Sequence, residues 1–185
     1  MRRVIMWNVV SLDGYFEGPS KWDLERIHAV WSEDLERFSL DQLASADTLL
    51  FGRVTYEGMA SHWPSAEGPV ADSMNSVQKV VFSRTLEKAD WNNTRLVRGP
   101  AEEEVARLKA QPGKNILIFG SADLCSTLMR HDLIDEYRVG VSPIVLGQGT
   151  PLFKPGAVSK ALRLVDAKTL DKGLVILSYR PEGAA

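Results

Sequence analysis

The chain has 185 residues, of which 44% are hydrophobic and 25% charged, and its formal net charge is -2. These values are ordinary for one soluble globular domain, and the interspersed charges argue against a nucleic-acid-binding protein, which would carry a basic stripe. The apolar runs are strand-sized, far below the roughly 20 residues of a membrane span. A single cysteine, Cys125, cannot form an intramolecular disulfide, so a cytoplasmic location is expected. The three histidines lack the short spacings of metal motifs, which predicts no metal site.

Strand and helix patterns alternate along the first two thirds of the chain. Val4–Val10 reads as a first strand rather than a signal peptide, because no small-residue cleavage site follows it. A Gly/Pro/Ser loop spans residues 14–20, and residues 32–46 carry apolar side chains at helical spacing. The next expected elements are strands at Thr48–Phe51, Val80–Phe82 and Thr94–Val97 and short helices at Thr55–Ser61 and Val70–Val77.

The last third of the chain changes in character. Pro100 opens an amphipathic helix that ends near residue 111, and Asn115–Phe119 is an apolar strand followed by another helix. Beyond Asp135, turns rather than helices separate the expected strands, which predicts an antiparallel end to the sheet. Those strands are Tyr137–Val141, Leu162–Ala167 and Leu174–Tyr179, with a hairpin turn at Asp171-Lys172-Gly173. We therefore expect one α/β domain over residues 1–180, with a mixed, mostly parallel central sheet, and a frayed tail at 181–185.

Three loops that follow apolar strands carry residues suited to phosphate groups. They are Gly52-Arg53-Val54-Thr55, Ser83-Arg84 and Gly120-Ser121-Ala122-Asp123. In an open α/β sheet, loops that leave the carboxyl ends of strands line the ligand crevice. Glycine permits close backbone approach, arginine offers a planar fork of donors, and a helix start presents free N–H groups to an anion.

Each of these loops also has a plainer explanation. Gly52 to Thr55 equally fits a strand-to-helix turn in which Thr55 is the N-cap residue. A surface turn is the commoner explanation for Ser83-Arg84 when it is considered alone. Any tight turn into a helix needs a small residue, so Gly120 alone is a weak signal. The prediction depends on the three loops together, because a dinucleotide needs donors from several of them.

In combination these segments resemble a known family. Gly52-Arg53-x-Thr55-Tyr56-Glu57, Ser83-Arg84 and Phe119-Gly120-Ser121-Ala122 are similar to the cofactor-binding motifs of the dihydrofolate reductase fold. Val10-Ser11-Leu12-Asp13-Gly14, Leu133–Glu136 and Ser142–Gly149 resemble one branch, the reductase domain of the bifunctional riboflavin-biosynthesis deaminase–reductase and its stand-alone relatives. The resemblance covers residues 3 to about 179. It implies a dihydrofolate reductase-like three-layer sandwich, NADPH as cofactor and a homodimer.

The resemblance also implies roles for individual residues. It assigns the cofactor phosphates to Gly52, Arg53 and Thr55, the ribose 2′-phosphate to Ser83 and Arg84, the pyrophosphate to Gly120, Ser121, Ala122 and Asp123, and the nicotinamide to backbone near Val9. Ser83 and Arg84 would favour NADPH over NADH. Asp13 is the candidate catalytic residue, although a role in capping the backbone of its own turn explains it equally well.

Several positions depart from the family pattern. Phe119 and Met59 stand where the riboflavin enzyme has acidic residues, and Ser121 replaces its second glycine. Those acids belong to the substrate side, so the substrate is left open while the cofactor site is retained. The zinc deaminase motif is absent from the sequence. Asp34 and Glu36 are candidates, by region only, for the carboxylate that grips a pterin in folate reductases.

The function expected from these residues is NADPH-dependent reduction of a small pteridine- or pyrimidine-like heterocycle. The alternatives are the riboflavin-pathway reduction of 5-amino-6-(5-phosphoribosylamino)uracil and a non-catalytic NADPH-binding protein. Tyr15, Phe16 and Trp22 would either cover a flat substrate or pack against the sheet edge. Glu57 and Glu136 could supply protons or hold substrate, but solvated or structural roles are expected for both. His28 and His62 are expected at the surface.

Overall fold

A computed structural model describes residues 1–183 of the chain. The helices are α1 (Glu25–His28), α2 (Glu33–Ala44), α3 (Arg53–His62), α4 (Pro69–Ser76), α5 (Ala101–Ala110) and α6 (Ala122–Arg130). The strands are β1 (Val4–Val10), β2 (Tyr15–Glu17), β3 (Ala46–Gly52), β4 (Gln78–Phe82), β5 (Thr94–Val97), β6 (Asn115–Phe119), β7 (Glu136–Val141), β8 (Thr150–Pro151), β9 (Leu162–Thr169) and β10 (Val175–Pro181). None of the helices in this part of the chain has both the length and the apolar character needed to cross a membrane.

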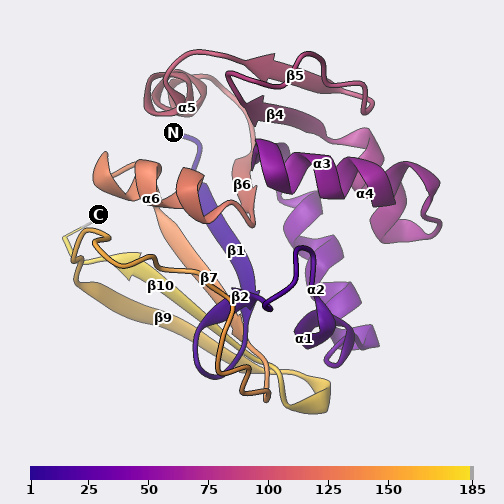
Figure 1. Ribbon diagram of the computed structural model, residues 1–185. Coiled ribbons are helices and arrows are strands. Elements are labelled where there is room, and N and C mark those ends of the chain that lie inside the picture. The colour runs from indigo at the N-terminus through magenta and orange to yellow at the C-terminus, as the bar shows by residue number, and fades with distance from the viewer. Residues whose placement is uncertain (184–185) are drawn as a thin grey trace.

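The central sheet has eight strands in the order β5-β4-β3-β6-β1-β7-β10-β9 (Figure 1). Neighbours from β5 to β7 are parallel, whereas β10 is antiparallel to both β7 and β9. The predicted mostly parallel sheet with an antiparallel C-terminal end is therefore confirmed. A short second sheet pairs β2 with β8.

Helices cover both faces of the sheet and make three layers. Alternate residues of β1 point to opposite faces: Met6 packs in a core with Val105 of α5 and Leu128 of α6. Trp7, one position on, packs with Leu35 of α2 on the other face. All seven residues of β1 are buried, as expected for a strand covered on both sides.

The two edges of β1 are paired over different lengths. Its pairing with β6 ends at Trp7, opposite Phe119, whereas its pairing with β7 continues to Val10, opposite Val141. Within residues 1–183, the last three residues of β1 therefore have no strand on the β6 side. Such a gap at the carboxyl ends of parallel strands is where α/β sheets bind ligands.

Most expected elements are present, with a few differences at their ends. Helix α3 begins at Arg53, with Gly52 at the N-cap position, so the prediction that Thr55 caps this helix is wrong. The loop expected at 14–20 contains β2, and neither β2 nor α1 was predicted. Pro181, expected in the tail, pairs with Leu162 as the end of β10; residues 184–185 of that tail lie outside the described residues.

Candidate functional site

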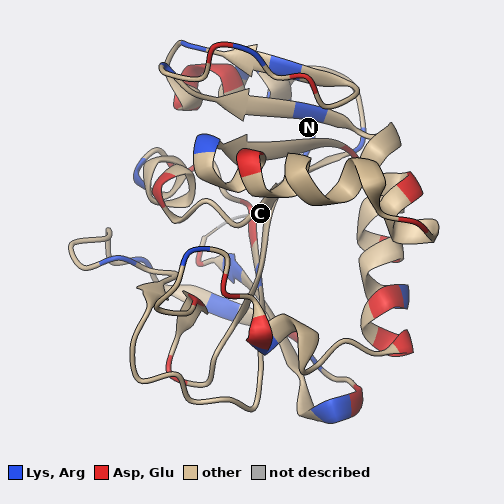
Figure 2. Ribbon diagram, turned by 45° about the vertical axis from the view of Figure 1, so that its right-hand side comes forward, with Lys and Arg blue, Asp and Glu red and all other residues tan. Residues whose placement is uncertain are grey.

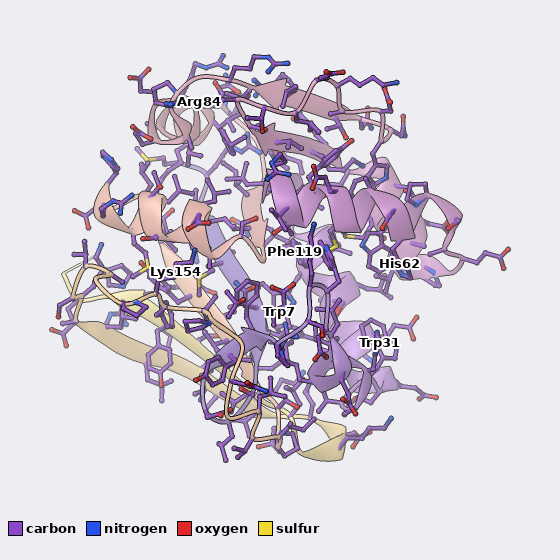
Figure 3. All side chains as sticks on the ribbon, in the orientation of Figure 1. Trp7, Trp31, His62, Arg84, Phe119 and Lys154 are labelled. Carbon is purple, nitrogen blue, oxygen red and sulfur yellow. The ribbon has the colours of Figure 1, made fainter. Side chains whose placement is uncertain are left out.

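A large cavity opens at the carboxyl ends of β1, β3 and β6. Its volume is about 1110 Å³, at the upper end of ligand pockets. Eight of the ten predicted cofactor-binding residues line this cavity, namely Val9, Gly52, Arg53, Thr55, Gly120, Ser121, Ala122 and Asp123. Figure 3 shows Phe119 and Trp7 near the centre of the molecule, where the ends of β6 and β1 meet. Loops that are distant in the sequence thus converge on one space.

A hydroxyl network joins two of the predicted loops. The Oγ of Ser121 accepts a hydrogen bond from the backbone N–H of Gly52 at 2.8 Å and donates to Oγ1 of Thr55 at 2.8 Å. Ser121 has a left-handed backbone, with φ 60° and ψ 62°. Glycine adopts this conformation most readily, and the two hydrogen bonds show what a serine contributes here.

Gly120 allows the two loops to approach each other. Its φ is +58°, and a Cβ at this position would lie 3.0 Å from Cγ2 of Thr55. Helix α6 then begins at Ala122 without a side-chain N-cap hydrogen bond. Its first backbone N–H groups therefore face the cavity at the positive end of the helix dipole, an arrangement that favours an anion.

The charged residues of these two loops, Arg53 and Asp123, are exposed, and each forms an ion pair with a neighbouring residue. Arg53 forms an ion pair with Glu57 at 3.0 Å, one helical turn away. Asp123 pairs with Lys154, which also lines the cavity, at 2.5 Å. Glu57 thus has the solvated role expected for it. Surface pairs of this kind are weak, so both cations remain accessible to a phosphate.

The two remaining cofactor candidates lie elsewhere. Neither Ser83 nor Arg84 is among the residues that line the cavity, and Arg84 lies apart from Phe119 and Trp7, toward β4 and α5 (Figure 3). The Oγ of Ser83 accepts hydrogen bonds from the backbone N–H groups of Thr85 and Leu86. Phe82, just before them, does line the cavity, so the Ser83-Arg84 turn leaves from its edge, and its role in cofactor binding stays a prediction.

Asp13 has a structural explanation. Its carboxylate accepts hydrogen bonds from Oγ of Ser11 at 2.6 Å and from the backbone N–H groups of Leu146 and Gly147. The hydrogen bond from Ser11, together with those from the backbone, lowers the pKa of Asp13 to about 2. A carboxylate that is ionised at neutral pH is no proton donor, and Asp13 does not line the cavity. The geometry gives it the turn-holding role, and its catalytic role stays a prediction without support from the cavity.

The other half of the cavity is aromatic and apolar. Its walls come from β2, from α1 to α4 and from the loops beside them, and include Phe16, Trp22, Leu24, Ile27, Trp31, Met59, Trp63 and Met74. His28 and His62 are exposed, as expected, but stand at the rim of this half. Of the two candidate pterin carboxylates, Glu36 lines the cavity, whereas Asp34 does not and pairs with Arg37.

Trp22 reaches across this half of the cavity to α3. A Cβ at Gly58 would lie 1.8 Å from Cζ2 of Trp22, so the indole packs directly on the glycine. Trp22 has a left-handed φ of 63°, and its backbone N–H donates to Oε1 of Glu17 at 2.7 Å. The prediction that Trp22 covers a ligand is consistent with this position, and no sequence signal identified Gly58 as its partner.

Two further polar residues at the cavity were missed by the sequence reasoning. Arg26 is 3% exposed, and its Nε donates to the carbonyl of Val9 at 2.9 Å. Burial lowers the pKa of Arg26 to about 10, against the raising effect of Glu17 and Asp23, so the guanidinium stays charged at neutral pH. Asn8, in β1, is also buried in the cavity wall. A lone asparagine in an apolar strand, or a lone arginine in a mixed segment such as α1, carries no motif.

Glu136 lies outside the cavity in a buried charge cluster. Its carboxylate pairs with Arg138 at 2.7 Å, Arg180 at 2.9 Å and Arg3 at 3.8 Å. Burial alone would raise the pKa of Glu136, but the arginines more than offset this, and the pKa lies below its ordinary value. The structural role expected for Glu136 agrees with these contacts.

Elsewhere in the molecule, charges of both signs are spread over the helices and loops (Figure 2).

A family model and two related sequences match nearly the whole chain. Residues 2–176 match the family described as the RibD C-terminal domain. The uncharacterized proteins YyaP and YwjB of Bacillus subtilis (strain 168) are 33% and 31% identical to this chain. The YyaP alignment covers 98% of this chain and 96% of YyaP, and the YwjB alignment covers 90% and 91%.

Solved structures have the same fold. A putative riboflavin biosynthesis protein from Shewanella sp. PV-4 is 26% identical, with a TM-score of 0.78 over 97% of this chain and 99% of that one. Dihydrofolate reductase from Enterococcus faecalis, complexed with NADP(H), is 15% identical, with a TM-score of 0.65. Its alignment covers 97% of this chain and 96% of the reductase. The bifunctional deaminase/reductase of Thermotoga maritima is 16% identical, with a TM-score of 0.67. Its alignment covers 97% of this chain and 56% of the Thermotoga chain. The fold is dihydrofolate reductase-like, and the chain belongs to the RibD C-terminal domain family.

Proposed function

We propose that this protein is an NADPH-dependent oxidoreductase that reduces a small, flat heterocycle of the pteridine or pyrimidine type. The observation that carries the proposal is the convergence of Gly52, Thr55, Gly120 and Ser121 on one cavity whose other half is aromatic. The reductase and NADP(H) named for structural neighbours support the same chemistry.

The residues present fit a dinucleotide. The N-terminus of α6 offers backbone N–H groups to a diphosphate, and the glycine turn before it leaves room for close approach. Arg53 and Lys154 add exposed cations on either side. When bound, NADPH supplies a hydride, and the protein's part is to orient the reactants and to exclude water.

The aromatic half would hold the substrate. Trp22, Trp31 and Trp63 offer flat faces for stacking on a heterocycle. Met59 and Phe119, which replace the acids of the riboflavin enzyme, both line the cavity. The wall is therefore apolar where that enzyme has charge, which favours a substrate other than the ribosylaminouracil phosphate.

Fluorescence titration of the protein with NADPH and NADH, followed by a turnover screen, tests the proposal. We expect tighter binding of NADPH and oxidation of NADPH by at least one pteridine, pyrimidine or related carbonyl or imine compound. Turnover of 5-amino-6-(5-phosphoribosylamino)uracil alone would assign the riboflavin-pathway reaction instead. Tight binding without turnover would indicate a non-catalytic NADPH-binding protein, and no binding of either dinucleotide would overturn the proposal.

Arg84→Ala tests the predicted contact with the 2′-phosphate. Because a hydrogen bond to a charged group contributes about 1.5–3 kcal/mol, NADPH affinity should fall roughly 10- to 100-fold while NADH affinity hardly changes. The measurement is the dissociation constant for each dinucleotide, with Arg98→Ala, the neighbouring exposed arginine that binds the carbonyl of Arg84, as the control for loop disturbance. Equal losses for both dinucleotides in Arg84→Ala would remove the 2′-phosphate role.

The family resemblance further predicts a homodimer. This prediction can be checked by light scattering on the purified protein.

A further inference from the structure

The Arg26 side chain lies in the gap beyond the end of β6. The carbonyl of Val10 accepts a hydrogen bond from the backbone N–H of Ser142, which follows β7. Successive carbonyls of a strand point to opposite sides, so the carbonyl of Val9 faces the β6 side, where the pairing of β1 with β6 has already ended at Trp7. Nε of Arg26 donates to this carbonyl at 2.9 Å. The guanidinium therefore occupies the place that a further residue of β6 would take.

One nitrogen of the Arg26 guanidinium is left for a ligand. Nε donates to Val9 and Nη1 donates to the carbonyl of Asp23, whereas Nη2 has no acceptor within residues 1–183. Nη2 is not one of the unpaired side-chain atoms that are fully buried in this part of the chain, so it keeps accessible surface although Arg26 as a whole is only 3% exposed. Because Arg26 lines the cavity, that surface opens into the cavity.

The charges around Arg26 indicate which acceptor fits Nη2. Burial lowers the pKa of Arg26, and the negative charges of Glu17 and Asp23 partly oppose this, although neither acid forms an ion pair with it within 4.0 Å among residues 1–183. When a ligand displaces water from the cavity, the free N–H groups of Nη2 need a new acceptor. Glu17 also lines the cavity and would repel a carboxylate. A neutral carbonyl oxygen is therefore the better acceptor.

The neighbours of Arg26 place it on the substrate side of the cavity. Leu24, Ile27 and His28 flank it in the sequence and line the aromatic half, which would hold the substrate. Val9, whose carbonyl accepts from Arg26, is the position predicted to meet the nicotinamide. Arg26 thus stands beside the point where the two reactants would meet, and it reaches that point from the substrate half.

We propose that Nη2 of Arg26 donates a hydrogen bond to a ring carbonyl oxygen of the substrate. The substrate is then a flat heterocycle with a lactam or ketone carbonyl, rather than one that has ring nitrogens alone or a carboxylate. This inference rests on the proposed function and deepens it, because it makes Arg26 the residue that selects and orients the substrate beside β1. The two hydrogen bonds from Arg26 to backbone carbonyls hold Nη2 in position.

The test measures binding of three flat probes at saturating NADP⁺: quinazolin-4-one, which has a ring carbonyl, quinazoline, which has none, and quinazoline-4-carboxylate. Wild type is compared with Arg26→Lys, which keeps the charge but lacks Nη2, and with Arg26→Met. The control is Arg2→Met, because Arg2 is also buried, at 7% exposed, and donates to the carbonyl of Lys114, but does not line the cavity. The readout is the ratio of the dissociation constants of quinazoline and quinazolin-4-one. Partial unfolding leaves this ratio unchanged, because both probes lose the same fraction of sites.

The hydrogen bond from a charged donor should give wild type and Arg2→Met a preference of about 10-fold or more for quinazolin-4-one over quinazoline. Both Arg26 variants should lose this preference, and quinazoline-4-carboxylate should bind wild type more weakly than quinazolin-4-one. A wild type without the preference, or a preference that survives in both Arg26 variants, would overturn the role of Arg26. Tighter binding of the carboxylate would overturn the choice of a neutral carbonyl.

NADPH and 2′-phosphoadenosine diphosphoribose, which lacks the nicotinamide, identify the molecule that Arg26 contacts. Unchanged NADPH affinity in the Arg26 variants supports the substrate contact. If these variants lose affinity for NADPH but not for the diphosphoribose probe, and keep the preference for quinazolin-4-one, the contact is with the nicotinamide carboxamide and the substrate contact is overturned. If wild type binds NADPH but shows no preference between the probes, this inference fails while the proposed function stands. If wild type binds no dinucleotide, the proposed function fails and this inference with it.

Discussion

The two halves of the cavity are built by different means. The polar half is fixed by short hydrogen bonds between neighbouring loops, such as those of Ser121 to Gly52 and Thr55. The aromatic half depends on packing between elements that are far apart in sequence, such as Trp22 on Gly58. The first is rigid and suited to a chemically constant cofactor, whereas the second can change its shape by single substitutions. A fold of this kind can keep its cofactor while its substrate changes.

Breaking the polar half should have the largest effect. In Gly120→Val, a left-handed backbone and the close Thr55 side chain both oppose the new Cβ. Strain of this kind costs about 1–3 kcal/mol, so we expect NADPH affinity to fall roughly 10- to 100-fold in a fluorescence titration. Gly156→Val is a matched control, because its φ is also positive, +81°, but nothing lies within 4 Å of its Cβ position. Equal losses of NADPH affinity in the two variants would contradict the role assigned to Gly120.

The same division explains what the sequence could predict. The parallel sheet and two of the three predicted polar loops follow from local signals, namely apolar strands followed by Gly, Ser and Thr, and these lie where they were expected. Ser83 and Arg84, the third loop, do not line the cavity. The position of Thr55 within α3 was not predicted, because Gly52 serves as the N-cap residue and no side chain marks the start of the helix. Gly58, Asn8 and Arg26 were missed because their importance depends on tertiary neighbours. The pairing of β2 with β8 joins segments about 130 residues apart, and no local pattern encodes it.

Disturbing the aromatic half should have a smaller and separable effect. In Gly58→Ala the methyl group would displace Trp22, while helix propensity favours alanine by up to about 1 kcal/mol, so the helix is retained. We expect the KM for a reducible heterocycle to rise roughly 10-fold, since part of an aromatic wall is lost, with the NADPH affinity unchanged. Steady-state kinetics and acrylamide quenching of tryptophan fluorescence measure the two consequences. Gly99→Ala is the control, because nothing lies within 4 Å of a Cβ at Gly99, and it should change neither the KM nor the quenching. An unaltered KM in Gly58→Ala would show that Trp22 takes no part in substrate binding.

The smallest effect is expected behind the aromatic wall, at Lys79. Its Nζ donates to the carbonyls of Met74 and Asn75, at the end of α4, and lies 4.4 Å from the centre of the Trp91 ring. Burial lowers the pKa of Lys79 to about 8, below the value of roughly 10.4 for an exposed lysine. Between these two values the unfolded chain binds more protons than the folded protein, so this group makes the free energy of unfolding rise with pH.

Lys79→Met should therefore flatten the pH dependence of stability between about pH 8 and 10, because the difference in proton binding at this position is removed. Urea unfolding at several pH values measures it, with Lys21→Met, at an exposed lysine, as the control that should retain the wild-type slope. NADPH affinity should not change, because Lys79 supports α4 from behind and does not line the cavity. If Lys79→Met kept the wild-type slope of unfolding free energy against pH, the pKa of Lys79 would be the same in the folded and unfolded protein. The carbonyls of Met74 and Asn75 and the Trp91 ring would then stabilise the charged amine as well as water does. In that case Lys79 would remain charged between pH 8 and 10 and would support α4, in the wall of the aromatic half, over that whole range.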